Sequence, residues 1–150
     1  MRIAILGAGG VGGYYGGILA RAGHEVVMLA RGTHFDALQA RGIEIRTPEG
    51  SFTVPAEATD DPHALGQAEY AILAVKNYSL PEVAPVVRTL AGAGAVILPL
   101  LNGVEVVDRL LRHGVPRDRV LGGLRGCEFF DICAPNGCPL CVRFHCRSWT

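Results

Sequence analysis

The chain has 150 residues, which is the size of one domain. Hydrophobic residues make up 49% and charged residues 19%, and the formal net charge is zero. A neutral chain without clusters of Lys and Arg gives no reason to expect nucleic acid or a membrane surface as a partner. The longest apolar stretch, residues 93–101, is far shorter than the roughly 20 residues of a membrane-spanning helix. Because residue 2 already opens an apolar strand, we expect no leader peptide and a cytoplasmic protein.

The first part of the chain alternates between apolar strands and helices. Residues 2–6 form an apolar run, typical of a strand buried on both sides of a parallel sheet. A glycine-rich loop follows, then a helix to about residue 22 and a second buried strand over residues 25–30. The next helix is expected over residues 33–41, with Thr33 as its cap.

The pattern continues through the rest of the first 124 residues. Period-two alternation over residues 43–46 and 52–54 predicts a β-hairpin. Apolar runs at residues 70–75 and 95–101 predict strands, helices are expected over residues 79–90 and 104–112, and a strand could start at Val120. The order of elements predicts an α/β fold, a Rossmann-type, doubly wound, mostly parallel sheet over residues 1–124.

The loop after the first strand matches the pattern G-x-G-x-x-G in the run Gly7, Ala8, Gly9, Gly10, Val11, Gly12. The match stands between a predicted strand and a predicted helix, which is where a dinucleotide-binding loop occurs. Gly7 permits a tight turn, Gly9 lets the backbone approach a pyrophosphate, and Gly12 lets the helix pack closely. The helix N-terminus then attracts the phosphates. A glycine-rich turn without a ligand is the alternative interpretation.

The end of the second strand indicates which dinucleotide is bound. An NAD site usually has Asp or Glu there, to accept a hydrogen bond from the ribose 2′-hydroxyl. This strand ends in Arg31, and the next carboxylate is Asp36. A guanidinium can donate two parallel hydrogen bonds to a 2′-phosphate. The sequence therefore predicts NADP(H) as cofactor, and a solvated surface arginine is the alternative.

Polar residues follow two further predicted strands. Lys76 comes after residues 70–75, and Asn102 comes after residues 95–101. Ligands of open parallel sheets bind beyond the carboxyl ends of the strands, so both side chains are expected to face that crevice. Each could also be an ordinary loop residue.

These features together resemble the ketopantoate reductases (2-dehydropantoate 2-reductases). The similarity is carried by the first 13 residues, by Leu-Ala-Arg31, by Val-Lys76-Asn-Tyr, by Leu-Leu-Asn102-Gly-Val and by Val120-Leu-Gly-Gly. It covers residues 1–124. The resemblance implies NADPH-dependent reduction of a small-molecule 2-oxo acid, ketopantoate, to pantoate, a step in pantothenate synthesis. It also implies that Lys76 and Asn102 lie near the nicotinamide ribose and that Asn102 contacts the substrate.

The family also has a second, mostly helical domain that supplies a substrate-binding lysine and an acid. This chain has no counterpart of that domain, so we assign no catalytic residue and expect the chain alone to be inactive. The alternative function is a non-catalytic NADP-binding module or an inactive gene fragment. An uncovered crevice face would expose apolar surface and favour self-association.

Residues 125–150 differ in character from the rest of the chain. This tail contains every cysteine of the sequence: Cys127, Cys133, Cys138, Cys141 and Cys146. A structural zinc site is one interpretation, but adjacent His145 and Cys146 are poorly spaced for one tetrahedral site. A redox pair of Cys138 and Cys141 is another, without a thioredoxin-like context. We favour a third, a shift of reading frame near residue 125, and assign no metal ligand.

Overall fold

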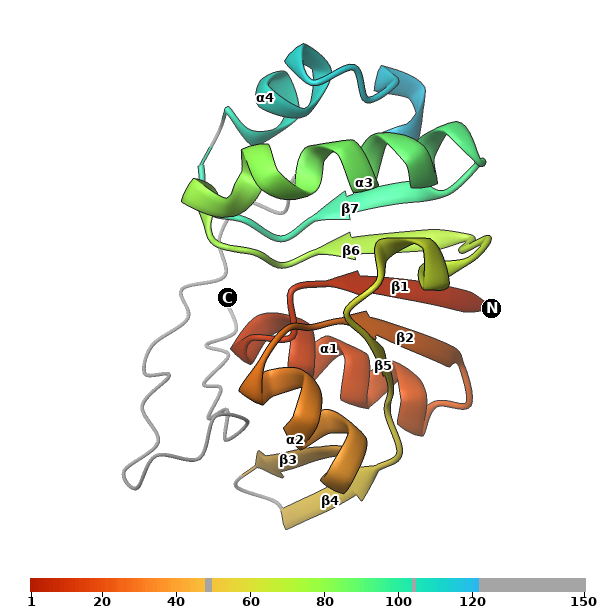
Figure 1. Ribbon diagram of the computed structural model, residues 1–150, viewed down its shortest axis with the longest axis vertical. Coiled ribbons are helices and arrows are strands. Elements are labelled where there is room, and N and C mark those ends of the chain that lie inside the picture. The colour runs from red at the N-terminus through yellow and green to blue at the C-terminus, as the bar shows by residue number, and fades with distance from the viewer. Residues whose placement is uncertain (48–49, 104, 122–150) are drawn as a thin grey trace, which may run out of the picture.

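The computed structural model describes residues 1–47, 50–103 and 105–121 (Figure 1). Its centre is a five-stranded sheet in the order β5-β2-β1-β6-β7, and all four strand pairings are parallel. The strands are β1 (Arg2–Leu6), β2 (Glu25–Leu29), β5 (Glu57–Thr59), β6 (Tyr70–Leu73) and β7 (Val96–Pro99). The predicted Rossmann-type α/β fold is confirmed.

Helices connect the strands and cover the two faces of the sheet. The helices are α1 (Gly10–Arg21), α2 (Thr33–Arg41), α3 (Leu80–Gly92) and α4 (Val106–Arg112). Short 3₁₀ helices are η1 (Pro62–Leu65), η2 (Asn77–Ser79) and η3 (Arg117–Arg119). The predicted hairpin forms a separate antiparallel pair, β3 (Ile43–Thr47) with β4 (Gly50–Val54), beside α2 at the end of the molecule remote from α4 (Figure 1).

Alternate residues of the buried strands enter two different apolar cores. Ala4 and Leu6 of β1 belong to the core that contains the inner faces of α3 and α4. Ile3 and Ile5 belong to the core shared with α2 and the hairpin, against which the aromatic and aliphatic side chains of α1 pack. This alternation is the period of two of a strand, applied to a sheet that is covered on both sides.

The strand order reverses between β1 and β6, and this reversal positions the site. From β1 the chain proceeds through α1 to β2 on one side, whereas β6 and the following α3 lead to β7 on the other side. The helices of the two halves consequently lie on opposite faces of the sheet. A crevice opens at the carboxyl ends of β1 and β6, where such folds bind their ligands.

Several details differ from the sequence-based expectations. Thr33 is not a cap: Gly32 with φ of 56° occupies the cap position of α2, and no side chain caps that end. The short strand β5 was not predicted. Val120 forms an isolated parallel bridge with Ile97 at the outer edge of β7, which agrees with the start of a strand there. The remainder of that expected strand and the cysteine-rich tail, residues 122–150, lie outside the described residues.

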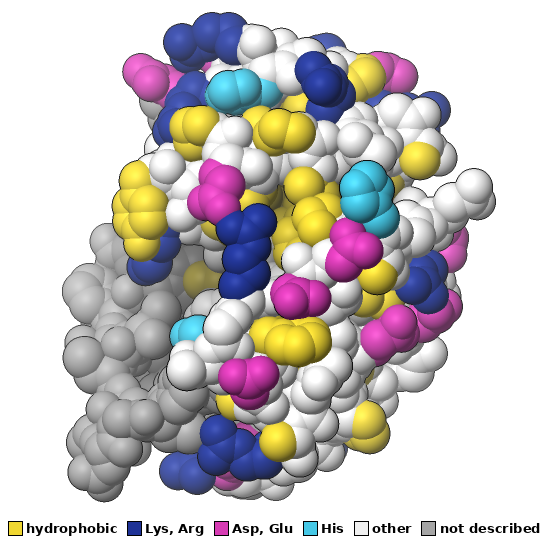
Figure 2. Space-filling model, viewed as in Figure 1, with side chains coloured by type: hydrophobic (Ala, Val, Ile, Leu, Met, Phe, Trp, Pro, Cys, Tyr) yellow, Lys and Arg dark blue, Asp and Glu magenta, His cyan; other side chains and the backbone are white. Residues whose placement is uncertain are grey.

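On the side shown in Figure 2, basic and acidic side chains are interspersed, and no region of the described surface carries a single sign of charge. None of the helices in the described ranges combines the length and the apolar character that crossing a bilayer requires.

Candidate functional site

A cavity of about 280 Å³ lies at the carboxyl ends of β1, β2 and β6. Its walls come from the glycine loop after β1, the end of β2, the start of α2, the segment after β6 and the first turn of α3. The lining residues are Gly7, Ala8, Gly9, Leu29, Ala30, Arg31, His34, Val75, Ser79, Glu82 and Val83. The cavity therefore stands at the reversal of strand order, where the topology of the sheet predicts a ligand.

The glycine loop turns sharply between β1 and α1. Gly7 has φ of 104°, a conformation that disfavours any side chain, and a Cβ there would lie 2.9 Å from the carbonyl oxygen of Ala74. Helix α1 begins at Gly10, and its first hydrogen bond runs from the Gly13 N–H to the Gly9 carbonyl at 2.7 Å. The N–H groups of residues 10–12 precede that bond, so they have no partner within the helix and can receive an anion.

Gly9 and Gly12 are glycines for different reasons. A Cβ on Gly12 would lie 1.9 Å from the carbonyl oxygen of Gly7, so only glycine allows the helix to pack so closely on the loop. A Cβ on Gly9 would meet no protein atom within 4 Å, and Gly9 lines the cavity. The space that a side chain would fill at Gly9 is thus left open on the ligand side.

Arg31 stands two residues beyond β2 and lines the cavity on the side opposite α3. Its guanidinium Nη1 forms an ion pair with the Oε1 carboxylate oxygen of Glu82, in the first turn of α3. The two side chains are 60% and 58% exposed, respectively. This pair joins the two halves of the fold across the cavity.

His34, in the first turn of α2, contributes a second polar group to the cavity. Its Nδ1 atom is buried and has no hydrogen-bond partner among the described residues. A buried polar atom without a partner costs free energy, so a polar ligand at this wall would offset that cost. This orphaned atom, the open space at Gly9 and the free N–H groups of α1 all fit a phosphorylated dinucleotide.

Lys76 and Asn102 lie farther along the same edge, on the loops after the neighbouring strands β6 and β7. Asn77 connects the two loops, because its Nδ2 donates to the carbonyl of Asn102 at 2.6 Å. Arg109 of α4 also binds Asn77. Its Nη2 donates to the Asn77 carbonyl at 3.0 Å, and its Nη1 donates to Asn77 Oδ1 at 3.5 Å. We call Asn77, Asn102 and Arg109 the loop bracket.

The cavity brings together only some of the residues singled out in the sequence. Gly7, Ala8, Gly9 and Arg31 line it, whereas the other five do not. Those five are Gly10, Val11 and Gly12 at the start of α1, and Lys76 and Asn102 on the adjoining loops.

Sequence reasoning missed three polar lining residues: His34, Ser79 and Glu82. Each lies in or just before the first turn of a helix that follows a strand. In a parallel sheet these first turns stand beside the carboxyl ends of the strands, so this position was the available signal. Glu82 carries no motif, and only the fold shows that it faces Arg31.

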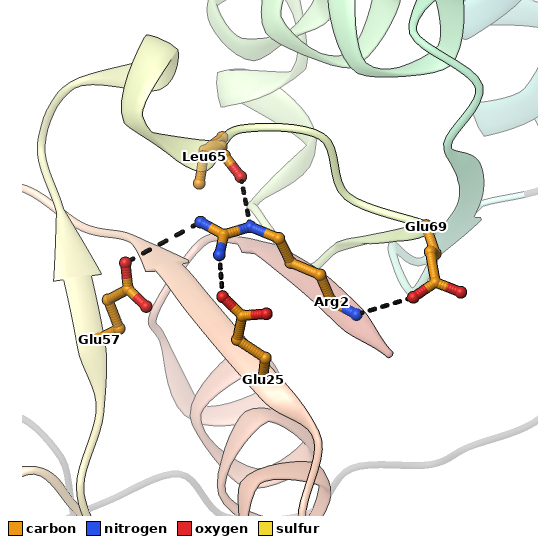
Figure 3. Close-up of polar contacts among 5 residues, drawn as sticks. All are labelled: Arg2, Glu25, Glu57, Leu65 and Glu69. Atoms are coloured by element: carbon orange, nitrogen blue, oxygen red, sulfur yellow. Dashed lines mark hydrogen bonds and ion pairs between the residues drawn. The ribbon is translucent and has the colours of Figure 1, made fainter.

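The opposite edge of the sheet carries an ionic cluster centred on Arg2 (Figure 3). Its guanidinium pairs with Glu25, lies 3.9 Å from Glu57 Oε1 and donates from Nε to the Leu65 carbonyl at 3.3 Å. The backbone N–H of Arg2 donates to Glu69 Oε1 at 3.0 Å. This cluster ties the beginnings of the strands together, away from the cavity.

Comparison with known proteins identifies relatives over most of the chain. The family model described as ketopantoate reductase PanE/ApbA matches residues 3–132. An uncharacterized oxidoreductase, YkpB, of Bacillus subtilis is 35% identical over 124 residues, covering 83% of this chain and 40% of the relative. A 2-dehydropantoate 2-reductase of Mesorhizobium japonicum is 34% identical over 105 residues, covering 69% of this chain and 32% of the relative.

A solved structure agrees with these sequence matches. The crystal structure of a 2-dehydropantoate 2-reductase from Geobacter metallireducens superposes with a TM-score of 0.79 at 30% identity. It covers 96% of this chain and 46% of that protein. The chain thus spans less than half the length of each of these three proteins.

Proposed function

Because the chain belongs to the ketopantoate reductase PanE/ApbA family of oxidoreductases, we propose that it is the cofactor-binding half of an NADPH-dependent 2-oxo acid reductase. The substrate class that we propose is ketopantoate or a related 2-oxo acid, with pantoate or the corresponding 2-hydroxy acid as product. The observation that carries the proposal is the cavity that places the open side of Gly9 and the guanidinium of Arg31 around one space.

Each wall of the cavity has its own part in this proposal. The N–H groups at the start of α1 hold the pyrophosphate, and the missing Cβ of Gly9 lets it approach the backbone. Arg31 donates to the 2′-phosphate on the adenosine side. When bound, the reduced nicotinamide supplies the hydride for the substrate carbonyl.

Lys76 and Asn102 serve the other end of the dinucleotide in this proposal. The loop bracket joins the loop after β6, which bears Lys76, to the loop after β7, which bears Asn102. Both side chains can donate hydrogen bonds to ribose hydroxyls, to the nicotinamide amide or to a 2-oxo acid carbonyl. Asn102 is the residue that we assign to the substrate as well.

Reduction also needs the ketone to be held in place and a proton to be delivered to its oxygen. No described residue is assigned to this proton transfer, and we propose that the chain alone has little activity. A dinucleotide-binding module without turnover is the second candidate function, because the features of the cavity all concern the binding of a dinucleotide.

Calorimetry and a spectrophotometric assay separate these functions. NADPH binding together with NADPH oxidation that depends on ketopantoate supports the reductase. Binding without oxidation supports the module. If well-folded protein binds neither NADPH nor NADH, both functions are refuted.

A cytoplasmic location, self-association and a boundary near residue 124 remain parts of this proposal. Sedimentation of purified protein at several concentrations tests self-association. Translating the encoding DNA in the other two frames after residue 124 tests the proposed frameshift.

A further inference from the structure

The ion pair between Arg31 and Glu82 occupies the guanidinium that the proposed function assigns to the 2′-phosphate. Both residues line the cavity, one from the end of β2 and the other from the first turn of α3. Arg31 therefore already has an anionic partner within the site. A dinucleotide phosphate that binds there has to share Arg31 with this carboxylate or displace it.

Stability does not explain this pair. Both side chains are more than half exposed, and exposed ion pairs contribute little to folding. Within the described part of the chain, the Glu82 carboxylate makes a polar contact with Arg31 alone, whereas the carboxylates of Glu25 and Glu57 on the opposite edge share the Arg2 guanidinium. The Glu82 carboxylate is therefore expected to act on ligand binding rather than on stability.

A carboxylate beside Arg31 affects the binding of NADP(H) and of NAD(H) differently. A 2′-phosphate carries about 1.5 to 2 negative charges at neutral pH, so it is repelled by Glu82 and competes with it for Arg31. A ribose 2′-hydroxyl is neutral and can donate a hydrogen bond to a carboxylate. Glu82 thus disfavours NADP(H) relative to NAD(H), which opposes the effect of Arg31.

We propose that Glu82 is a specificity-determining residue that competes with the 2′-phosphate for Arg31 and limits the preference for NADP(H) over NAD(H). This inference rests on the proposed function, since it requires the dinucleotide to occupy the cavity. It adds to that function a residue that works against the phosphorylated cofactor.

The test measures the affinity of the full chain for NADPH, NADH, 2′,5′-ADP and 5′-ADP in the wild type and in Glu82→Gln. We expect Glu82→Gln to bind NADPH and 2′,5′-ADP about 3- to 10-fold more tightly, as expected for removal of one nearby like charge. Affinity for NADH and 5′-ADP should change less than twofold or fall slightly. Asp36→Asn is the matched control, because Asp36 is an exposed carboxylate in α2 that does not line the cavity.

Two further variants show whether the effect passes through Arg31. In the Arg31→Ala background the gain from Glu82→Gln should be smaller, because the competition for the guanidinium is gone and only the direct repulsion between Glu82 and the phosphate is relieved. An unchanged gain there, an equal gain in Asp36→Asn, or weaker NADPH binding by Glu82→Gln would each overturn the competition. In those cases the wild type still binds NADPH and the proposed function stands. If the folded wild type binds no dinucleotide, both the inference and the proposed function fail.

Discussion

At Gly9 and Gly12 the absence of a side chain has separable consequences for binding and for folding. Gly9→Ala should leave the free energy of unfolding within about 1 kcal/mol of the wild type, because the new methyl meets no protein atom and the backbone conformation suits alanine. Affinity for NADPH should fall at least tenfold, since the methyl enters the space proposed for the pyrophosphate. Urea denaturation and calorimetry measure the two quantities.

Gly12→Ala should show the reverse pattern, with a loss of stability as its main effect. Its Cβ would lie 1.9 Å from the Gly7 carbonyl oxygen, so α1 has to move away from the loop. We expect a loss of stability of about 2 kcal/mol or more, within the range of overpacked sites. A Gly12→Ala protein as stable as the wild type would contradict the close packing of helix and loop.

Arg31→Ala should separate the two cofactors. The variant loses the donors proposed for the 2′-phosphate, and hydrogen bonds to charged groups contribute roughly 1.5–3 kcal/mol each. Because Arg31 is exposed and paired with Glu82, we expect the lower end, about a 10- to 30-fold weaker affinity for NADPH, with NADH affected less than twofold. Equal losses for the two dinucleotides in calorimetric titrations would refute the role of Arg31.

At the scale of elements, we expect the loop bracket to influence the nicotinamide end of the proposed site. Arg109→Ala removes the two contacts that join α4 to Asn77. The loops bearing Lys76 and Asn102 then move more freely, and ordering them on binding costs free energy. We expect affinity for NADPH to fall about 3- to 10-fold, roughly 0.7–1.4 kcal/mol.

The fragment 2′,5′-ADP provides the discriminating measurement for the loop bracket. It lacks the nicotinamide half, so Arg109→Ala should leave its affinity unchanged. Arg112→Ala is the matched control, because Arg112 lies on the same helix and, among the residues that the structure describes, its side chain donates to the carbonyl of Asp108 in the preceding turn and to no other residue. Equal losses for the fragment and for NADPH would show that the variant disturbs the whole domain.

The strands and helices that carry strong patterns could be predicted from the sequence. The apolar run of residues 2–6 coincides with β1, and the helix expected over residues 33–41 coincides with α2. Strand β5 could not be predicted, because Glu57–Thr59 has no apolar alternation and is a strand only through its pairing with β2. Tertiary pairing determines such short edge strands.

The site was predictable to the extent that it follows from local motifs. The glycine loop and Arg31 have fixed places after β1 and β2, so their meeting at one cavity follows from the Rossmann pattern. Glu82 and the loop bracket depend on how α3 and α4 are placed, which no local spacing encodes. Their contacts span 51 residues for Arg31 with Glu82 and 32 residues for Arg109 with Asn77.

At the scale of the whole molecule, stability and binding are assigned to opposite edges of one sheet. The Arg2 cluster connects β1, β2, β5 and the segments before β6 at their amino ends, and the cavity lies at the carboxyl ends (Figure 3). Changes at the Arg2 cluster should consequently alter folding and leave dinucleotide affinity alone.

Arg2→Met tests this separation. It removes the guanidinium that contacts the carboxylates of Glu25 and Glu57 and the Leu65 carbonyl, so we expect a loss of about 1–2 kcal/mol in the free energy of unfolding. Affinity for NADPH should change less than twofold. Exposed Arg88→Met on α3 serves as the control for urea denaturation. A large drop in affinity at unchanged stability would show that the two edges are coupled.

The solvent exposure of the Arg31–Glu82 pair has a consequence for evolution. Neither side chain contributes to an apolar core, so substitutions at these positions are nearly neutral for the scaffold. If Arg31 and Glu82 select the cofactor as proposed, natural selection can act on that choice through two surface codons, without compensating mutations elsewhere in the gene. A lineage could shift from one reductant pool of the cell to the other in single mutational steps.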